Sequence, residues 1–399
     1  MDLKSLLLLI MGHLVVDTPQ GALPALLPLL KQAQGLSYAQ AGAIVMIMNL
    51  TSSVIQPLFG HFTDRWRLRW LLPAGLAVSG LGFALVGLAP GYGTILVLVV
   101  ISGLGVASFH PEAFKAVLGS VSTRKVVGVS WFMVGGNLGM VLGPLMVGLY
   151  CAWLGLRGTL LFALPGVMMA GLLLWNWPRL QALRSLEPGQ EQGRPQPLAG
   201  RLAPLGILVG AVILRAWVYS GITAFVPFYY VGVLGGQEVD TWRLLTTFLL
   251  AGVLGTALGA PLAEKVGPKR FFVITVALTT PLTLWFLHSS GFWMYLAMAL
   301  DGAFLISTWS VVMVMAQQIL PDRAGMVSGL MVGFAIGTGG IGAAVLGAVA
   351  DRWGVGTVLH VVAVMPLLSA LAGCFVPAGA SRPPKPQPLA PGATGSARP

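Results

Sequence analysis

The sequence predicts an all-α membrane protein of twelve transmembrane helices in two six-helix, pseudo-symmetric halves. Charged residues make up only 9% of the 399 residues and hydrophobic residues 56%, and a surrounding lipid phase penalises charge. Apolar runs of about 20 residues, the length that crosses a bilayer, recur along the chain. Lys and Arg gather in alternate segments between these runs. These observations together indicate a protein that crosses a lipid bilayer many times.

The apolar runs give the expected helices in chain order: 5–30, 38–60, 70–89, 94–117, 126–150, 157–177, 203–233, 243–262, 271–289, 291–317, 325–350 and 355–376. The first run contains His13 and Asp17 and lacks a small-residue cleavage site, so we expect a retained span and not a signal peptide.

The longest internal polar segment, 178–202, is expected to be a flexible cytoplasmic linker between the halves 1–177 and 203–376. The Pro-rich segment 377–399 is expected to be a disordered cytoplasmic tail.

The positive charges predict the orientation. With a cytoplasmic N-terminus, eighteen Lys and Arg residues fall in inner segments and four in outer ones, which is a strong positive-inside signal. We therefore expect a multi-pass protein of the plasma (inner) membrane with both termini cytoplasmic. The net charge of +11 reflects this topology, so no nucleic-acid partner is expected. The two cysteines form no CxxC pair or disulfide framework, and we expect neither a metal nor another cofactor.

Two loops repeat a charged pattern at a spacing of 200 residues. "GHFTDRWRLR" (60–69) follows the second expected helix and "APLAEKVGPKR" (260–270) follows the eighth. The first loop resembles the signature of the major facilitator superfamily, which it matches at Gly60, Asp64, Arg65 and Arg69. The second loop is similar with conservative changes, at Glu264 and Lys265 among others. This resemblance implies two halves that work by alternating access, a monomer, and a latch formed by these charged residues; the alternative is a basic loop that only sets topology.

A narrower resemblance covers both halves. "FHPE" (109–112), "GGNLG…GP" (135–144) and "RAWV" (215–218) are similar to the fosmidomycin-resistance family of drug exporters. In the first helix, Val16 stands where that family's pattern has Asn. The fifth helix carries Gly139, Gly143 and Pro144, which partly match a motif associated with antiporters. Close helix packing is the alternative explanation of these glycines.

Few ionisable groups lie well within the expected spans. A charge at the bilayer centre costs at least about 2.5–3.5 kcal/mol, so such groups normally face a bundle interior or a wet cavity. The resemblance implies that the first, fourth, seventh and tenth helices line a central cavity. The ionisable residues lie on these four helices: His13, Asp17, His110, Glu112, Arg215 and Asp301.

Four of these residues are candidates for proton coupling. His13 and Asp17 share one helix face with Gln20 and Pro24 because of their spacing. Pro111 is expected to kink its helix and to display His110 and Glu112 there. The alternatives are a structural hydrogen bond between His13 and Asp17 and a Glu112–Lys115 pair at the membrane edge.

Arg215 cannot readily lose its proton and therefore needs an anion. Asp301, Asp17, Glu112 or an anionic group of a substrate could serve, and a structural Arg215–Asp301 pair is an equal alternative to a substrate contact. Aromatic side chains at similar depth form either a pocket wall or an interfacial belt. The substrate-binding candidates are Arg215, Asp301, Gln20, Asn137, Trp131, Trp217 and Tyr219.

These features predict a secondary transporter that exports a small organic solute or antibiotic, coupled to protons. No ATP-binding motif of the GxxxxGK[ST] type is present. The alternative function is an uptake symporter or uniporter for an organic anion, nucleoside or sugar. An enzyme is not expected, since no G-x-S-x-G context accompanies Ser108 and His110. A sensor is not expected either, because it would normally carry an additional soluble domain, and only the linker 178–202 and the tail 377–399 are available here.

Overall fold

The computed structural model describes residues 2–66, 68–121, 125–183, 200–320 and 324–377, and the described residues form helices and short connections without a β-strand. The first half consists of α1 (Leu3–Gln34), α2 (Tyr38–Asn49), η1 (Leu50–Val54), α3 (Gln56–Arg65), α4 (Leu71–Ala84), η2 (Val86–Leu88), α5 (Tyr92–Ser120), α6 (Lys125–Leu154), η3 (Gly155–Phe162), α7 (Ala163–Trp175) and α8 (Trp177–Ala182). The second half consists of α9 (Leu202–Gly232), η4 (Glu238–Asp240), α10 (Thr241–Val266), α11 (Pro268–Leu287), α12 (Gly291–Ile319), α13 (Ala324–Trp353) and α14 (Val355–Phe375).

Eleven helical stretches of the described residues are long and apolar enough to cross a membrane. One of them, Gly128–Trp175, is 48 residues long and contains most of α6 and all of α7, joined by the 3₁₀ turn η3. Counting these two separately gives the twelve crossings that the sequence predicts. Helix α8 continues to Ala182, beyond the expected start of the linker at 178. The remainder of that linker at 184–199, and the expected tail from 378 onward, lie outside the described residues.

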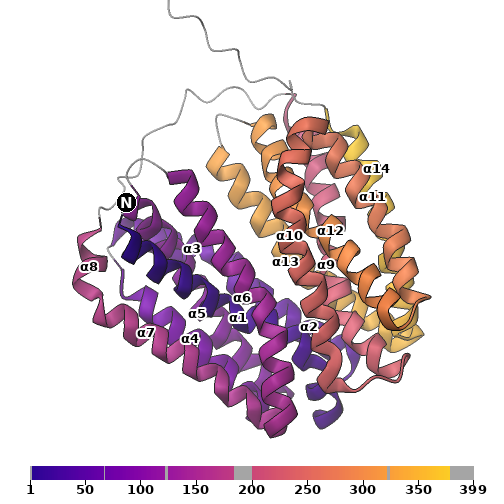
Figure 1. Cartoon of the computed structure of the whole chain (residues 1–399), viewed down its shortest axis with the longest axis horizontal. Coiled ribbons are helices and arrows are strands. Elements are labelled where there is room, and N and C mark those ends of the chain that lie inside the picture. Colours follow the sequence, from indigo (N-terminus) through magenta and orange to yellow (C-terminus); the bar gives the residue numbers. More distant parts are fainter. Residues whose placement is uncertain (1, 67, 122–124, 184–199, 321–323, 378–399) are drawn as a thin grey trace, which may run out of the picture.

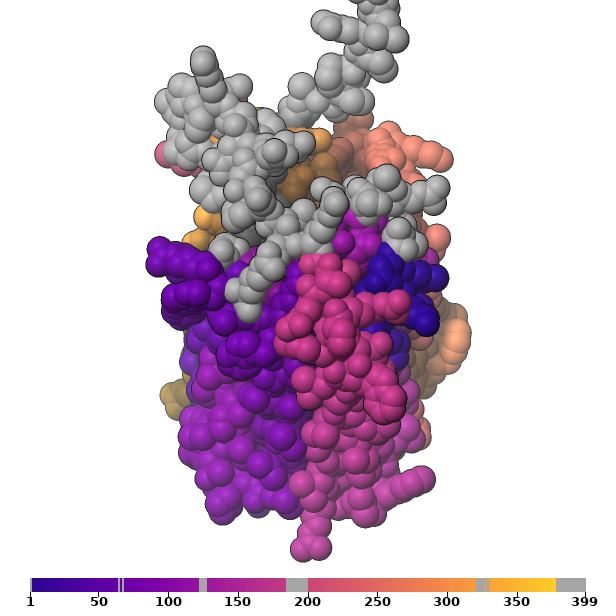
Figure 2. All heavy atoms as spheres, turned by 90° about the vertical axis from the view of Figure 1, so that its left-hand side faces the viewer, coloured from indigo at the N-terminus to yellow at the C-terminus, as the bar shows by residue number. Residues whose placement is uncertain are grey.

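The two halves form two helical bodies that lie side by side (Figure 1). The first half, coloured indigo to magenta, forms the face that is turned toward the viewer in Figure 2. Glycines allow the halves to approach along α2 and α13, since a Cβ atom at Gly42 would overlap the backbone of Ala343, and one at Gly347 the backbone of Tyr38. The small residues of α2 and α13 therefore allow the backbones of the two halves to pack closely against each other.

The halves contact each other at one end of the bundle and diverge at the other. At the contact end, Asp351 of α13 accepts hydrogen bonds from the backbone N–H groups of Tyr38 (2.7 Å) and Ala39 (2.9 Å). Nearby, the ring of Trp242 of α10 packs against Gly148 of α6. Figure 1 shows the halves separating toward the end that carries the N-terminus. The two halves are therefore in direct contact at one end of the molecule, and their helices lie farther apart at the other.

Proline does not break the long helices that build this arrangement. α5 continues as one helix through Pro111, and the kink expected there stays a prediction, since a continuous helix can still bend at a proline. α1 contains Pro19, Pro24 and Pro28, and α6 contains Pro144. Each proline removes one backbone donor, so the helix continues with one hydrogen bond fewer at each of these positions.

The glycines of α6 bring it against α1. A Cβ atom at Gly139 would overlap Leu14 O, and one at Gly143 would overlap the backbone around Ala22. Close helix packing thus accounts for these two glycines of the expected Gly-Pro motif. The same packing fixes the position of α1, and therefore of its polar face, in the wall of the space between the halves.

Candidate functional site

A cavity of about 590 Å³ lies between the two halves. The first half contributes polar residues of α1, α2, α3, α5 and α6, and the second half contributes residues of α9, α10, α12 and α13. Among the described residues that line it, Asp17 is the only carboxylate and Arg215 the only Lys or Arg. The polar and aromatic lining residues are His13, Asp17, Gln20, Asn49, Ser53, Gln56, His110, Phe114, Phe132, Asn137, Arg215, Tyr219, Ser220, Thr223, Thr256 and Trp309.

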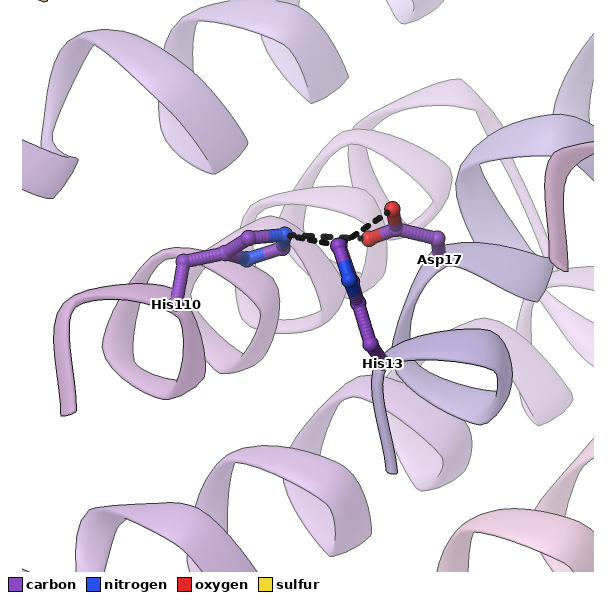
Figure 3. A group of neighbouring side chains, drawn as sticks. All are labelled: His13, Asp17 and His110. Carbon is purple, nitrogen blue, oxygen red and sulfur yellow. Dashed lines mark hydrogen bonds and ion pairs between the residues drawn. The ribbon is translucent and has the colours of Figure 1, made fainter. Parts of the chain in front are cut away.

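His13, Asp17 and His110 form a compact cluster on the first-half wall, and we call these three residues the His-Asp-His cluster (Figure 3). His13 and Asp17 come from successive turns of α1, and His110 comes from α5. The Nε2 atom of His13 lies 3.2 Å from Asp17 Oδ2, and Nε2 of His110 lies 3.3 Å from Asp17 Oδ1. The two Nε2 atoms are 3.2 Å apart. All three functional groups therefore face one small volume.

Backbone carbonyls fix which ring nitrogens carry hydrogen in this cluster. Nδ1 of His13 lies 2.7 Å from Phe132 O, and Nδ1 of His110 lies 2.8 Å from Val106 O. A carbonyl oxygen only accepts, so each Nδ1 must donate. Both Nε2 atoms are thus available to bind or release a proton. With no, one or two protons on these atoms, the cluster is negative, neutral or positive, because Asp17 supplies one negative charge.

The same three residues have the spacing of a metal site. Their ligand atoms lie within 4.8 Å of one another, and no other such group of three occurs within the described parts of the chain. Both imidazoles present Nε2 to the common volume, while Nδ1 is engaged by a carbonyl. Ligating histidines are commonly oriented by a second hydrogen bond of this kind.

Arg215 of α9 lies on the second-half wall of the cavity and is 4% exposed. Its Nε donates to Thr308 Oγ1 at 2.6 Å and its Nη2 to Leu305 O at 2.9 Å, both on α12. The guanidinium carbon also lies 5.5 Å from the ring centroid of Trp309. Among the described residues, no carboxylate forms an ion pair with Arg215. Its positive charge therefore faces the cavity without a counter-ion from these residues.

Arg215 and Asp301 do not form the ion pair that the sequence suggests. Asp301 is fully buried and accepts a hydrogen bond from Thr283 Oγ1 of α11 at 2.8 Å, while its other oxygen, Oδ1, has no hydrogen-bond partner among the described residues. Asp301 does not line the cavity. It lies nearly two turns before Thr308 on α12, which separates the two positions by about 10 Å along the helix axis. The two charged groups therefore belong to different helix contacts.

Glu112 also lies away from the cavity, although the sequence suggests that it faces it. It is 5% exposed, and its Oε1 lies 3.7 Å from Nε of Arg69. Lys115 Nζ donates to Thr63 Oγ1 at 2.8 Å. Neighbouring positions on α5 point in different directions, about 100° apart for successive residues, which is why His110 and Glu112 separate.

The contacts described for the residues expected to form a latch lie within the first half. Arg69 donates to the backbone carbonyls of Leu180 and Leu183, and therefore ties the start of α4 to α8 within the first half. Arg65, Glu264 and Lys265 are exposed. Gly60 lies on α3, where a Cβ atom would lie 3.9 Å from Pro111 of the same half. The side chain of Asp64 lies outside the described part of the chain.

The remaining substrate-binding candidates fall into two groups. Gln20, Asn137 and Tyr219 line the cavity. Trp131 is 58% exposed and Trp217 packs against Gly342 of α13, so neither tryptophan lines it. The sequence reasoning missed Asn49 and Gln56 on the α2–α3 segment, where polar residues within an apolar run were the available signal. It also missed Thr308, whose contact with Arg215 has no signal in the sequence.

Comparisons with known proteins agree with this architecture. The family model described as Major Facilitator Superfamily matches residues 9–242 and 238–398. The "Fosmidomycin resistance protein" of Escherichia coli (strain K12) is 32% identical over 370 residues, which cover 92% of this chain and 91% of that protein. The "Uncharacterized MFS-type transporter YfnC" of Bacillus subtilis (strain 168) is 34% identical over 380 residues, with the same coverage.

The solved structures include a similar fold at low sequence identity. A bacterial homologue of the human lysosomal transporter Spinster, in an inward-facing and occupied conformation, gives a TM-score of 0.78 at 15% identity and covers 93% of this chain and 96% of that one. Both expected resemblances are thereby confirmed. The two six-helix halves, the cavity between them and these matches together show that the chain belongs to the major facilitator superfamily of membrane transporters.

Proposed function

We propose that this transporter exports a small organic anion by alternating access and couples the movement to protons. The observation that carries the proposal is Arg215, a buried guanidinium on the cavity wall that has no carboxylate partner among the described residues. A buried charge without a partner is costly, and an anionic solute would supply the missing counter-ion. A fosmidomycin-like solute, with a phosphonate group, fits this requirement.

The guanidinium is oriented for such a group. Thr308 and Leu305 accept from Nε and Nη2, so the plane of Arg215 is fixed from the side of α12. Of its five N–H donors, those not used in these two bonds remain for an oxyanion. A planar fork of this kind binds carboxylate, phosphate or phosphonate through two hydrogen bonds.

Proton coupling is assigned to the first-half wall. His13, Asp17 and His110 are the ionisable residues of that wall within the described chain, and a proton gained or lost there changes the charge that faces Arg215 across the cavity. For an exchange, the added proton and the anion must occupy the cavity in alternate steps, because each of them changes the net charge that closure buries. Glu112 remains a fourth candidate, acting from behind the wall through Arg69.

The direct test is proton movement in proteoliposomes that contain a pH-sensitive dye. A panel of solutes with matched size is added: phosphonates including fosmidomycin, carboxylates, a neutral nucleoside or sugar, and organic cations. We expect proton movement with anions, opposite in direction to the solute. Movement in the same direction would indicate an uptake symporter, and solute flux without protons a uniporter.

Two variants separate the parts of the proposal. Arg215→Gln should weaken anion binding at least about 30-fold, because truncating one member of a buried charge pair costs about 2–5 kcal/mol. Asp17→Asn should retain anion binding and lose anion-driven proton movement. Normal proton movement in Asp17→Asn would refute the assigned coupling wall, while equal transport of anions and cations by the parent protein would refute the proposed solute class.

A further inference from the structure

We propose that the His-Asp-His cluster binds a divalent transition-metal ion of the Zn²⁺ type, with two imidazole nitrogens and one carboxylate as ligands. This inference goes beyond the proposed transport activity and rests on geometry alone. The ligands are Nε2 of His13, Nε2 of His110 and the carboxylate of Asp17, which meet at the cavity wall. Imidazole and carboxylate are ligands that Zn²⁺ and its neighbours in the first transition row accept.

The distances between the ligand atoms match those of a coordination polyhedron. Zn²⁺ bonds to His nitrogen and Asp oxygen are about 2.0–2.2 Å, so tetrahedral angles separate neighbouring ligand atoms by about 3.3–3.5 Å. The two Nε2 atoms are 3.2 Å apart, and each lies close to a different oxygen of Asp17: His13 Nε2 is 3.2 Å from Oδ2 and His110 Nε2 is 3.3 Å from Oδ1. With a single oxygen as the Asp17 ligand, the three ligand atoms lie within 4.8 Å of one another. An ion about 2 Å from each atom therefore needs only a small adjustment of these side chains.

The direction of the groups supports a shared centre. Asp17 Oδ1 lies 3.3 Å from His110 Nε2, yet it is buried and has no hydrogen-bond partner among the described residues. The two Nε2 atoms are within hydrogen-bond geometry of each other, whereas Oδ1 contacts His110 at ion-pair distance without the alignment of a hydrogen bond. An acceptor oxygen left without a bond in this position is satisfied by a cation placed between the three groups.

The surroundings hold the ligands in the orientation that binding requires. Phe132 O and Val106 O accept from Nδ1 of the two histidines, which leaves a lone pair on each neutral Nε2 directed at the centre. Gly136 of α6 provides the room: a Cβ atom there would overlap His13 Nε2 and would lie 2.8 Å from Asp17 Oδ2. The absence of a side chain at residue 136 thus keeps the ligand atoms free.

Three protein ligands leave the metal with at least one further position. His13, Asp17 and His110 all line the cavity, so that position faces the space that also contains Arg215. A metal with an open position binds water or an oxygen of a solute. The metal and a transferable proton use the same Nε2 lone pairs, so binding one excludes the other.

The test measures Zn²⁺ and Co²⁺ binding by the purified full-length protein in detergent without any solute. The parent carries a histidine-free affinity tag and the substitutions His61→Asn, His288→Asn, His360→Asn and Cys374→Ser, which remove the other imidazoles and the exposed thiol. We expect one ion per chain, a visible Co²⁺ spectrum of four-coordinate type, and an X-ray absorption spectrum with two imidazole ligands. Because this spectrum needs no cluster variant, it remains informative if a variant fails to fold.

Cluster variants then assign the site. Each of three single substitutions should weaken Zn²⁺ binding by more than about 100-fold: His13→Asn, His110→Asn and Asp17→Asn. Removing a group that only orients a ligand costs about 10- to 100-fold, so a larger loss identifies a ligand. Gly136→Ala should weaken it as well, although all three ligands are retained. A parent protein that binds neither ion would overturn the proposal. Binding that persists when all three ligands are replaced would also overturn it, because the ion would then lie elsewhere.

Discussion

Arg215 is positioned by neutral partners, Thr308 and Leu305 O, and not by a carboxylate of the described residues. The distinction matters because a fixed acid would neutralise the guanidinium permanently and leave little reason for an anion to bind. Neutral acceptors orient the group and preserve its charge. The side chain of Thr308 is therefore predicted to be a positioning residue for the anion.

Thr308→Val tests that role, since it removes the hydroxyl and keeps the shape of the side chain. The hydrogen bond from Arg215 Nε to Thr308 is lost, and such a bond typically contributes about 0.5–1.5 kcal/mol, so the anion should bind roughly 2- to 12-fold more weakly. The matched control is Thr247→Val on α10, where the hydroxyl bonds only Arg243 O of its own helix. The measurement is the anion Kd from calorimetry in detergent. Equal Kd values for both variants and the parent would contradict the role of Thr308.

Asp301 presents the opposite situation, a buried carboxylate without a cation among the described residues. Its one hydrogen bond comes from Thr283, and Thr283 Oγ1 also lies 2.9 Å from Thr279 O. Asp301→Leu therefore leaves the threonine hydroxyl with an acceptor and removes the cost of the buried carboxyl. We predict an unfolding temperature that is equal or higher, with anion transport retained. A large fall in transport with unchanged stability would show that Asp301 takes part in the transport cycle.

At the scale of elements, the N-terminus of α2 is capped partly by the opposite half. Ser37 and Gln40 form a capping box within α2, while Asp351 accepts from the N–H groups of Tyr38 and Ala39 across the interface. A carboxylate at a helix N-terminus also interacts favourably with the helix dipole. When the halves separate at this end, the Asp351 contacts must break and the Ser37 contacts need not.

This difference predicts the outcome of two capping variants. An N-cap interaction is worth about 0.5–2 kcal/mol, so Asp351→Ala should shift the population toward the conformation open at this end by roughly 2- to 30-fold. Ser37→Ala weakens the same helix start but should leave that population unchanged. Distances between spin labels placed on α2 and α13 near this end measure the shift. Equal effects of the two variants would mean that Asp351 only stabilises the helix.

The packing of α6 against α1 leads to a further prediction at this scale. A methyl group at Gly143 would overlap the backbone of α1, and overpacking typically costs about 1–3 kcal/mol. Gly143→Ala should therefore lower the unfolding temperature and disturb the cluster that α1 carries. Gly171→Ala on α7 is the control, because nothing lies within 4 Å of its Cβ position. That change should be neutral or slightly stabilising, since alanine has the higher helix propensity.

For the molecule as a whole, the helix number and four of the six ionisable residues expected at the cavity were predictable from the sequence. The positions of Glu112 and Asp301 away from the cavity, and the pairing of the charged groups, were not. Apolar run length gives the spans because lipid leaves the backbone few alternatives to a helix. The i to i+4 spacing of His13 and Asp17 places them on one face. The approach of His110, 97 positions from His13, depends on how α1 and α5 pack. In the same way, the packing of α9 against α12 makes Thr308, and not Asp301, the partner of Arg215. No local sequence pattern encodes either contact.

Alternating access predicts that one side of the membrane reaches Asn137, which is exposed on the cavity wall, while the other side does not. The positive-inside distribution predicts that the end carrying the N-terminus, where the halves lie farther apart, faces the cytoplasm. In a background with Cys151→Ala and Cys374→Ser, a cysteine at position 137 should react with a membrane-impermeant maleimide in inside-out vesicles and resist it in right-side-out vesicles.

Adding Asp351→Ala should raise labelling of position 137 from the outside, because it weakens the contact between the halves at that end. A cysteine at position 153, where the native Trp153 lies in the last turn of α6 and is 84% exposed, should label from the outside in either case and so serves as the orientation control. Labelling of position 137 from the outside alone would reverse the assigned orientation, and unchanged labelling with Asp351→Ala would remove that carboxylate from the outer closure.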